Sequence, residues 1–67
     1  MKLIINNELV EIAQLNPTVN ELLAIRGVKP TGTAVAVNDR IIKKDLRDTI
    51  RVHEGDNITI ISAAFGG

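Results

Sequence analysis

The sequence predicts an α+β fold, in which a mixed sheet of about five short strands holds one α-helix and a Gly-Gly tail projects from the C-terminal end. Two observations lead to this prediction. Only residues 16–30 combine the apolar spacing of a helix with helix end signals, whereas several short β-prone runs are separated by Asn, Asp and Gly. A single amphipathic helix cannot bury its own apolar face, so it must lie across the apolar face of a sheet.

The run KLIINNELVEI, residues 2–12, predicts a β-hairpin. Leu3 and Ile5 are spaced to share one face of the first strand, and Val10 and Ile12 are spaced in the same way in the second. The two Asn residues between the runs tolerate positive φ, which a tight hairpin turn requires.

The segment NPTVNELLAIRGVKP predicts a helix of about nine residues. Thr18 and Glu21 have the spacing of a capping box, in which the two residues satisfy amides of the first turn reciprocally. Gly27 is placed as a left-handed stop, and Pro30 prevents any continuation. The apolar stripe of the helix, at positions i, i+3 and i+4, consists of Val19, Leu22 and Leu23.

The second half of the chain predicts three further strands. Residues 33–44 have the pattern of a hairpin, with Asn38 and Asp39 at its turn. Residues 45–49 are expected to form a short turn or a 3₁₀ segment. Residues 54–56 predict a turn that leads into the last strand, NITIIS.

The resulting order, β-β-α-β-β-β, predicts a β-grasp, or ubiquitin-like, roll. It divides the chain into a domain at residues 1–62 and a tail at residues 63–67. Because side chains alternate along a strand, the sheet face opposite the helix should carry Ile4, Ala36 and Ile61. Uncovered apolar groups next to a projecting tail predict a docking surface for a partner protein.

Composition and charge exclude several classes of function. The 67 residues are enough for one small domain, and 45% of them are hydrophobic, which suits a compact aliphatic core. Eight Lys and Arg residues balance eight Asp and Glu, and Phe65 is the only aromatic residue, so nothing indicates nucleic-acid binding. No apolar run is long enough for a membrane span and the N-terminus has no signal-peptide pattern, so we expect a cytoplasmic protein.

The chain shows no catalytic or metal-binding constellation. It has no cysteine, and therefore neither a thiol nucleophile nor a Cys-based metal site. The one histidine, His53, stands beside Glu54 and Asp56, and such a group can suggest a metal or general-base role. All three residues lie in one turn that we expect to be exposed, and the chain has no other histidine. We therefore interpret them as polar residues of a solvated turn, and we expect no bound metal.

Three motifs carry a resemblance to a known family. The helix begins with TVNELL, and AVAVNDRIIKK is followed by VHEGDNITIISAAFGG. Over the whole chain this pattern resembles the ThiS family, the small sulfur-carrier proteins of thiamine thiazole synthesis. The resemblance implies a protein carrier rather than an enzyme, with no cofactor bound by itself.

The resemblance also implies the chemistry of the C-terminal end. An E1-like adenylating enzyme would use ATP to adenylate the Gly67 carboxylate. Sulfur from a donor such as a cysteine desulfurase persulfide would then produce a thiocarboxylate, which gives its sulfur to a thiazole synthase. Glycine has no Cβ, so Gly66 and Gly67 form the narrowest end that a chain can have. The segment entering the partner active site would consist of Ala63, Ala64, Phe65 and Gly66.

Several alternatives remain open at this point. Phe65 either folds back onto the sheet or anchors the tail in a partner. The small subunit of molybdopterin synthase shares the tail chemistry. Members of that family usually have a longer chain and prolines shortly before their Gly-Gly, and the segment SAAFGG has no proline. In a ubiquitin-like modifier, Gly67 would form an isopeptide bond. A β-grasp interaction module with an incidental tail is the alternative from another class.

Overall fold

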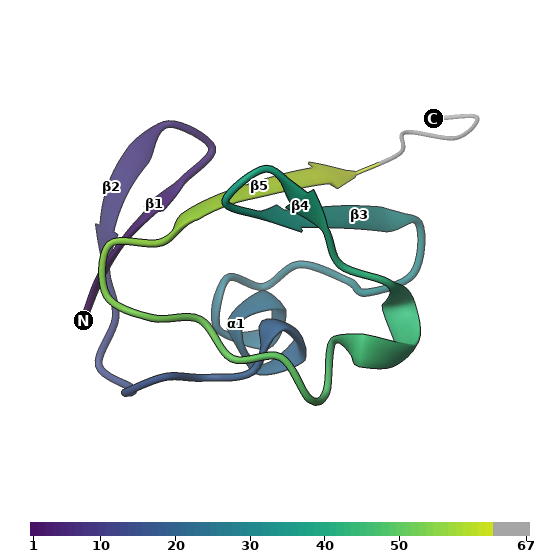
Figure 1. The fold of residues 1–67 in the computed structure, drawn as a ribbon, viewed down its shortest axis with the longest axis horizontal. Coiled ribbons are helices and arrows are strands. Elements are labelled where there is room, and N and C mark those ends of the chain that lie inside the picture. The colour runs from purple at the N-terminus through teal and green to yellow at the C-terminus, as the bar shows by residue number, and fades with distance from the viewer. Residues whose placement is uncertain (63–67) are drawn as a thin grey trace.

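Figure 1 shows the computed structural model of the chain, which describes residues 1–62. The predictions that concern residues 63–67, including the boundary between domain and tail, fall outside the described residues. The elements are β1 (Lys2–Ile5), β2 (Glu8–Glu11), α1 (Val19–Ile25), β3 (Thr33–Val37), β4 (Arg40–Ile41), the 3₁₀-helix η1 (Lys44–Leu46) and β5 (Asn57–Ser62).

The strands of this region form one mixed sheet in the order β2-β1-β5-β3-β4. β1 and β5 run parallel, whereas the β1–β2, β3–β5 and β3–β4 pairs are antiparallel. α1 lies across one face of the sheet, and β5 is the central strand (Figure 1). This arrangement is the predicted β-grasp roll, and it places β5 in the middle of the sheet.

The two hairpins close at the predicted turns. Asn6 and Asn7 have φ values of 50° and 68°, and Asn38 and Asp39 have φ values of 50° and 69°. Positive φ at both central residues gives the turn a twist that matches the twist of the flanking strands. Asn and Asp adopt this conformation at lower cost than most other residues with a side chain, which explains their presence at these turns.

The N-terminus of α1 has the predicted capping box. The Thr18 hydroxyl accepts a 3.1 Å hydrogen bond from the Glu21 backbone N–H, and the Glu21 carboxylate accepts a 2.8 Å bond from the Thr18 backbone N–H. Hydrogen bonding of the Glu21 carboxylate to the backbone N–H of Thr18, and then to the Thr18 side chain, favours the ionised form and holds the pKa of Glu21 below its ordinary value.

The helix ends at the predicted stop. α1 has seven residues between its caps Thr18 and Arg26, which makes nine with the caps, and Gly27, at φ +70°, reverses the chain. The Gly27 N–H donates to the Ala24 carbonyl and the Val28 N–H donates to the Leu23 carbonyl. These two bonds make a Schellman motif, which satisfies the last carbonyls and stops the helix at Ile25.

The core lies between α1 and the sheet. The predicted helix stripe is buried, and the alternation along the strands buries the expected face. Full burial of one such aliphatic side chain contributes about 1.5–3 kcal/mol. The buried apolar residues are Leu3, Ile5, Ile12, Val19, Leu22, Leu23, Val35, Ile42, Val52 and Ile58. Val37 and Ile60 pack against this cluster from the same face.

Within residues 1–62, no helix combines the length and the apolar character that a membrane span requires.

Candidate functional site

The end of β5 is the part of the predicted site that the structure describes. Ser62, its last residue, lies opposite Thr33 at the start of β3. β5 is bordered by β1 on one side and by β3 on the other. The tail residues that the sequence assigns to partner active sites, from Ala63 to Gly67, lie outside the described residues, so their roles stay predictions.

The outer face of the sheet carries an apolar surface beside this strand end. Ala34 lies opposite Ile61, and Ala36 lies between Thr59 and Ile41 in the register. Ile61 is 62% exposed and Ile41 is 72% exposed, although both are large apolar groups. We call Ala34, Ala36, Ile41 and Ile61 the outer apolar patch. It brings together two of the three residues that the sequence places on the docking face, Ala36 and Ile61.

Ile4, the third predicted residue, is separated from this patch. It lies opposite Leu9 on β2, and its neighbour on β5 is Asn57, four residues before Ile61. Ile4 and Leu9 therefore form a second exposed apolar pair at the other side of the face. Sequence alternation places Ile4 on the correct face, but only the strand register shows that it is not next to Ile61.

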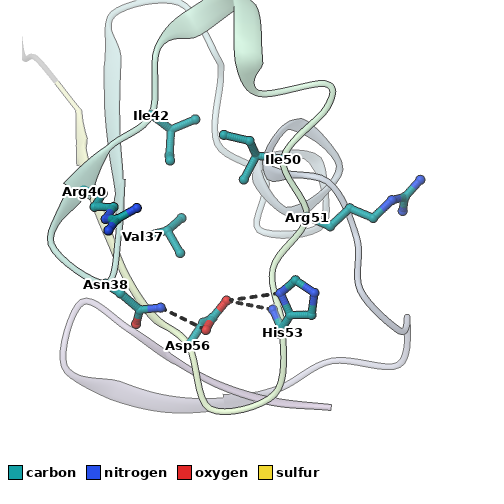
Figure 2. Close-up of a pocket in the computed structure, with 8 residues that line it drawn as sticks. All are labelled: Val37, Asn38, Arg40, Ile42, Ile50, Arg51, His53 and Asp56. Atoms are coloured by element: carbon teal, nitrogen blue, oxygen red, sulfur yellow. Dashed lines mark hydrogen bonds and ion pairs between the residues drawn. The ribbon is translucent and has the colours of Figure 1, made fainter.

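A groove opens between the β3–β4 hairpin and the segment 50–56 (Figure 2). Its volume is about 560 Å³. Apolar side chains and polar side chains meet around it, and Figure 2 shows the Arg51 guanidinium directed away from it. That guanidinium donates to the Asn16 carbonyl at 2.9 Å instead. The groove is lined by Val37, Asn38, Arg40, Ile42, Ile50, Arg51, His53 and Asp56.

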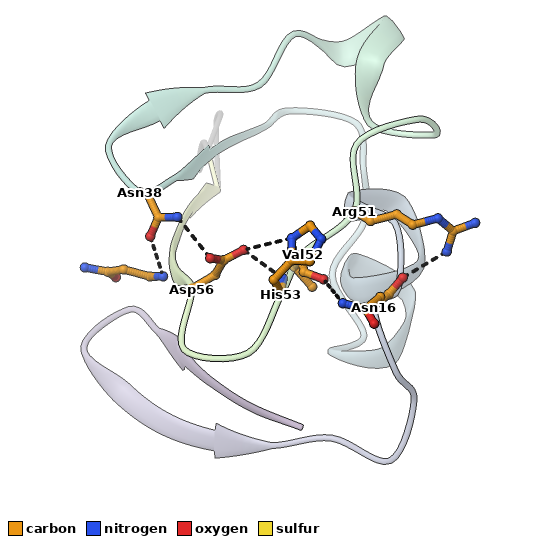
Figure 3. A network of polar contacts seen from close by, with 7 residues as sticks. Asn16, Asn38, Arg51, Val52, His53 and Asp56 are labelled. Carbon is orange, nitrogen blue, oxygen red and sulfur yellow. Dashed lines mark hydrogen bonds and ion pairs between the residues drawn. The ribbon is translucent and has the colours of Figure 1, made fainter.

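The polar side of the groove is a hydrogen-bonded network rather than a reactive centre (Figure 3). Asp56 accepts a 3.0 Å bond from the Asn38 amide and a 2.8 Å bond from the His53 backbone N–H. The His53 imidazole is 3.9 Å from the Asp56 carboxylate, and its side chain is 70% exposed. The described residues contain no group of three side chains that could hold a metal ion. The His53 side chain is therefore solvated, as the sequence predicts, whereas the Asp56 carboxylate is only 16% exposed and is held by the hydrogen bonds of the turn.

A buried arginine near the strand end is not expected from the sequence. Arg47 is only 4% exposed, although the sequence predicts only a short turn or a 3₁₀ segment there. Its guanidinium donates to the backbone carbonyls of Pro30 and Thr33, while its Nε atom has no partner within residues 1–62. A charged residue in a short polar run resembles a surface residue, and no local signal distinguishes it.

The fold and the exposed strand end define a class: small β-grasp proteins with an apolar sheet face beside the C-terminal strand. The model of the ThiS family matches residues 3–67, so the chain belongs to the ThiS family. Membership supports a role as a sulfur carrier in thiamine biosynthesis. No curated protein shows significant sequence similarity to the chain.

Two solved structures are similar to this chain. One is the crystal structure of a thiamine biosynthesis protein (ThiS) from Geobacter metallireducens, with a TM-score of 0.87 and 23% identity over the full length of both chains. The other is the NMR solution structure of a thiamine biosynthesis protein from Geobacter metallireducens, with a TM-score of 0.81 and 26% identity. The match to the solution structure covers 100% of this chain and 88% of that one. The similarity confirms the β-grasp fold.

Proposed function

We propose that this chain is a cytoplasmic sulfur carrier of thiamine thiazole synthesis, that Gly67 carries the sulfur, and that the chain binds no cofactor of its own. A carboxylate is a poor electrophile, so it must first become a mixed anhydride. An adenylating enzyme performs this step: the Gly67 carboxylate attacks the α-phosphate of ATP, and pyrophosphate leaves. A persulfide sulfur, supplied by a donor such as a cysteine desulfurase, then displaces AMP. A thiol reduces the resulting acyl disulfide, which leaves a thiocarboxylate for thiazole synthase.

The observation that carries this proposal is the extent of the family match. It runs through the last strand and includes both terminal glycines, so the tail is part of the shared pattern. The described residues contain no group of three side chains that could hold a metal ion for catalysis by the domain itself. Chemistry at the tail, performed inside partner enzymes, is consistent with both observations.

The outer apolar patch supports a docking role for the same end of the molecule. Its two isoleucines expose most of their surface to solvent, which is unfavourable in a free protein and favourable when a partner covers them. The patch includes Ile61, one residue before the last described residue of β5. A partner that covers the patch therefore lies close to the start of the tail. We propose the adenylating enzyme as that partner.

The test is intact-mass spectrometry of the protein after incubation with an adenylating enzyme, ATP and a persulfide donor. A mass gain equal to sulfur replacing oxygen, localised to Gly67, is the expected result. The matched control is the variant that lacks Gly66 and Gly67, which should remain unmodified. A folded protein that acquires neither adenylate nor sulfur from an active enzyme contradicts the proposal and favours a binding module.

The small subunit of molybdopterin synthase would give the same mass change, because both proteins use the same tail chemistry. The second stage of the experiment therefore supplies the thiocarboxylate to thiazole synthase with its other substrates. Formation of the thiazole product supports the thiamine assignment. A ubiquitin-like modifier would instead appear as a covalent adduct of Gly67 with a lysine of another protein.

A further inference from the structure

Beyond the ends of β1 and β4, two side chains continue the hydrogen bonding along the β3–β5 pair. The β3–β5 pair extends to Thr33 and Ser62, but β1 ends at Ile5, opposite Ile58. β4 ends at Ile41, and the chain then leaves the sheet for η1. The last part of the β3–β5 pair, Thr33–Val35 with Ile60–Ser62, therefore extends past both neighbours, and we call it the stem.

On the β1 side, Asn6 makes the hydrogen bonds that β1 would make if it continued along β5. Its backbone N–H donates to the Ile58 carbonyl at 2.9 Å. Its side-chain carbonyl then accepts a 2.8 Å bond from the Ile60 N–H, and its side-chain NH₂ donates to the Ile60 carbonyl at 3.2 Å. The amide of Asn6 thus occupies the place of the next peptide group and satisfies both backbone groups of Ile60.

On the β4 side, Arg47 supplies a hydrogen bond to the free edge of β3, as Asn6 does for β5. The Val35 carbonyl accepts a bond from the Ile42 N–H at 2.8 Å, which is the last backbone contact of that edge. The Thr33 carbonyl lies two residues earlier on the same side of β3, and it accepts a bond from the Arg47 guanidinium. Arg47 also donates to the Pro30 carbonyl at 3.2 Å and so fixes the loop that leads into β3. This position explains why a cation is buried here.

We propose that Asn6 and Arg47 are positioning residues that hold the stem, and with it the root of the tail and the patch residues Ala34 and Ile61, in a fixed place relative to the rest of the sheet. The inference rests on the proposed function. Five residues span at most about 17 Å, so the position of Ser62 limits where Gly67 can reach. A carboxylate must lie close to the α-phosphate to react, and a displacement of about 1 Å can lower a rate by as much as 100-fold.

The variants Asn6→Gly and Arg47→Met test this inference. Glycine accepts the positive φ of residue 6, which is 50°, so that change removes the side-chain bonds without straining the turn. Both variants remove side-chain hydrogen bonds to the stem and leave the apolar side chains of the outer apolar patch unchanged. Arg47→Lys keeps one cationic donor and should recover part of the effect. It also replaces Arg47→Met if that variant does not fold. Val52→Ala is the control for lost stability, because Val52 is buried but its backbone bonds are with Asn16 and Pro17.

Two measurements are made on each variant that circular dichroism shows to be folded. The first is hydrogen exchange at the amides of Ile60 and Ile61, which should become faster in Asn6→Gly and Arg47→Met. The second is pyrophosphate release by the adenylating enzyme. We expect kcat to fall about tenfold while KM for the carrier changes by less than about twofold, because the apolar side chains that dock are unchanged but the end is no longer held in place. Val52→Ala should keep the wild-type kcat.

The outcomes separate this inference from the proposed function. If the wild-type protein is not adenylated at all, the proposed function fails, and the exchange rates still decide whether the two side chains hold the stem. If the wild-type protein is adenylated and both variants keep its kcat, the positioning role is wrong. An equal loss of kcat in Val52→Ala would also overturn it, because stability alone would then explain the effect.

Discussion

The side-chain amide of Asn38 donates a 3.0 Å hydrogen bond to the carboxylate of Asp56, across 18 residues of sequence. The same Asn38 side chain accepts a 2.9 Å bond from the Asn57 N–H, at the first residue of β5. Asp56 also accepts a bond from the His53 N–H and thereby closes its own turn. This contact joins the β3–β4 turn to the turn that begins the central strand. It connects two motifs that the sequence shows only separately, VND and GDN.

We expect Asn38 and Asp56 to be energetically coupled. Asn38→Gly and Asp56→Ala should each lower the free energy of unfolding by about 1–2 kcal/mol, because each leaves polar groups unsatisfied. The double variant should lose less than the sum, by about 1 kcal/mol, because the shared bond is lost only once. Urea unfolding of the four proteins measures this coupling.

Asp39→Gly is the matched control for that cycle. Asp39 occupies the same turn at φ 69°, so glycine fits its backbone conformation equally well. Its variant should show no coupling to Asp56→Ala. Additive losses in the Asn38 and Asp56 pair would mean that the bond contributes nothing measurable.

The capping box predicts a defined pH dependence. The pKa of Glu21 is lowered in the folded protein by its bonds with Thr18, so its ionised form stabilises the fold above the ordinary pKa of glutamate. That contribution should be lost as the pH falls through the lowered pKa of the folded state. Wild type should therefore be more stable than Glu21→Gln at neutral pH, and the difference should vanish in acid.

Unfolding free energies of both proteins, measured across this pH range, check the prediction. Glu11→Gln, at an exposed glutamate on the edge strand β2, controls for the change in net charge. A difference between wild type and Glu21→Gln that stays constant into acid would contradict the assigned pKa shift.

A charge placed in the outer apolar patch should weaken binding to the partner without destabilising the fold. Ile61→Asp should raise the KM of the adenylating enzyme for this protein about tenfold or more, because it places a charge in the apolar centre of the proposed contact. Its unfolding free energy should change little, since Ile61 is 62% exposed. Leu9→Asp is the control, because Leu9 is 72% exposed but pairs with Ile4, away from the patch.

Equal effects of Ile61→Asp and Leu9→Asp on KM would show that the partner covers the whole sheet face. Unfolding of Ile61→Asp would show that this residue belongs to the core and not to a docking surface.

Moving the C-terminal carboxylate should cause the largest loss of adenylation. Adding one alanine after Gly67 moves the carboxylate onto a residue with a Cβ and displaces it by about 3.3–3.6 Å. We expect adenylation to be abolished while thermal unfolding remains as in wild type. ATP–pyrophosphate exchange with the adenylating enzyme measures this, with the unextended protein as control. Normal exchange by the extended protein would remove Gly67 from the reaction.

The sequence by itself determined the local elements. The Asn and Asp turns, the capping box of Thr18 and Glu21 and the stop at Gly27 each depend on residues within a few positions of one another. Alternation also placed Ile61 on the outer face, because the side-chain period of a strand does not depend on its neighbours. The resemblance to the ThiS family came from the same local motifs.

Tertiary structure decided which of these elements lie side by side. The pairing of β1 with β5, the separation of Ile4 from Ile61, and the bond between Asn38 and Asp56 all follow from strand register across the sheet. The sequence predicts only a turn at Asn6 and only a short turn or a 3₁₀ segment around Arg47, although both side chains complete the sheet beside the stem. The physical reason is that a hydrogen bond depends on the positions of both partners. A sequence names each donor and acceptor, but only the packed chain brings them within 3 Å of each other.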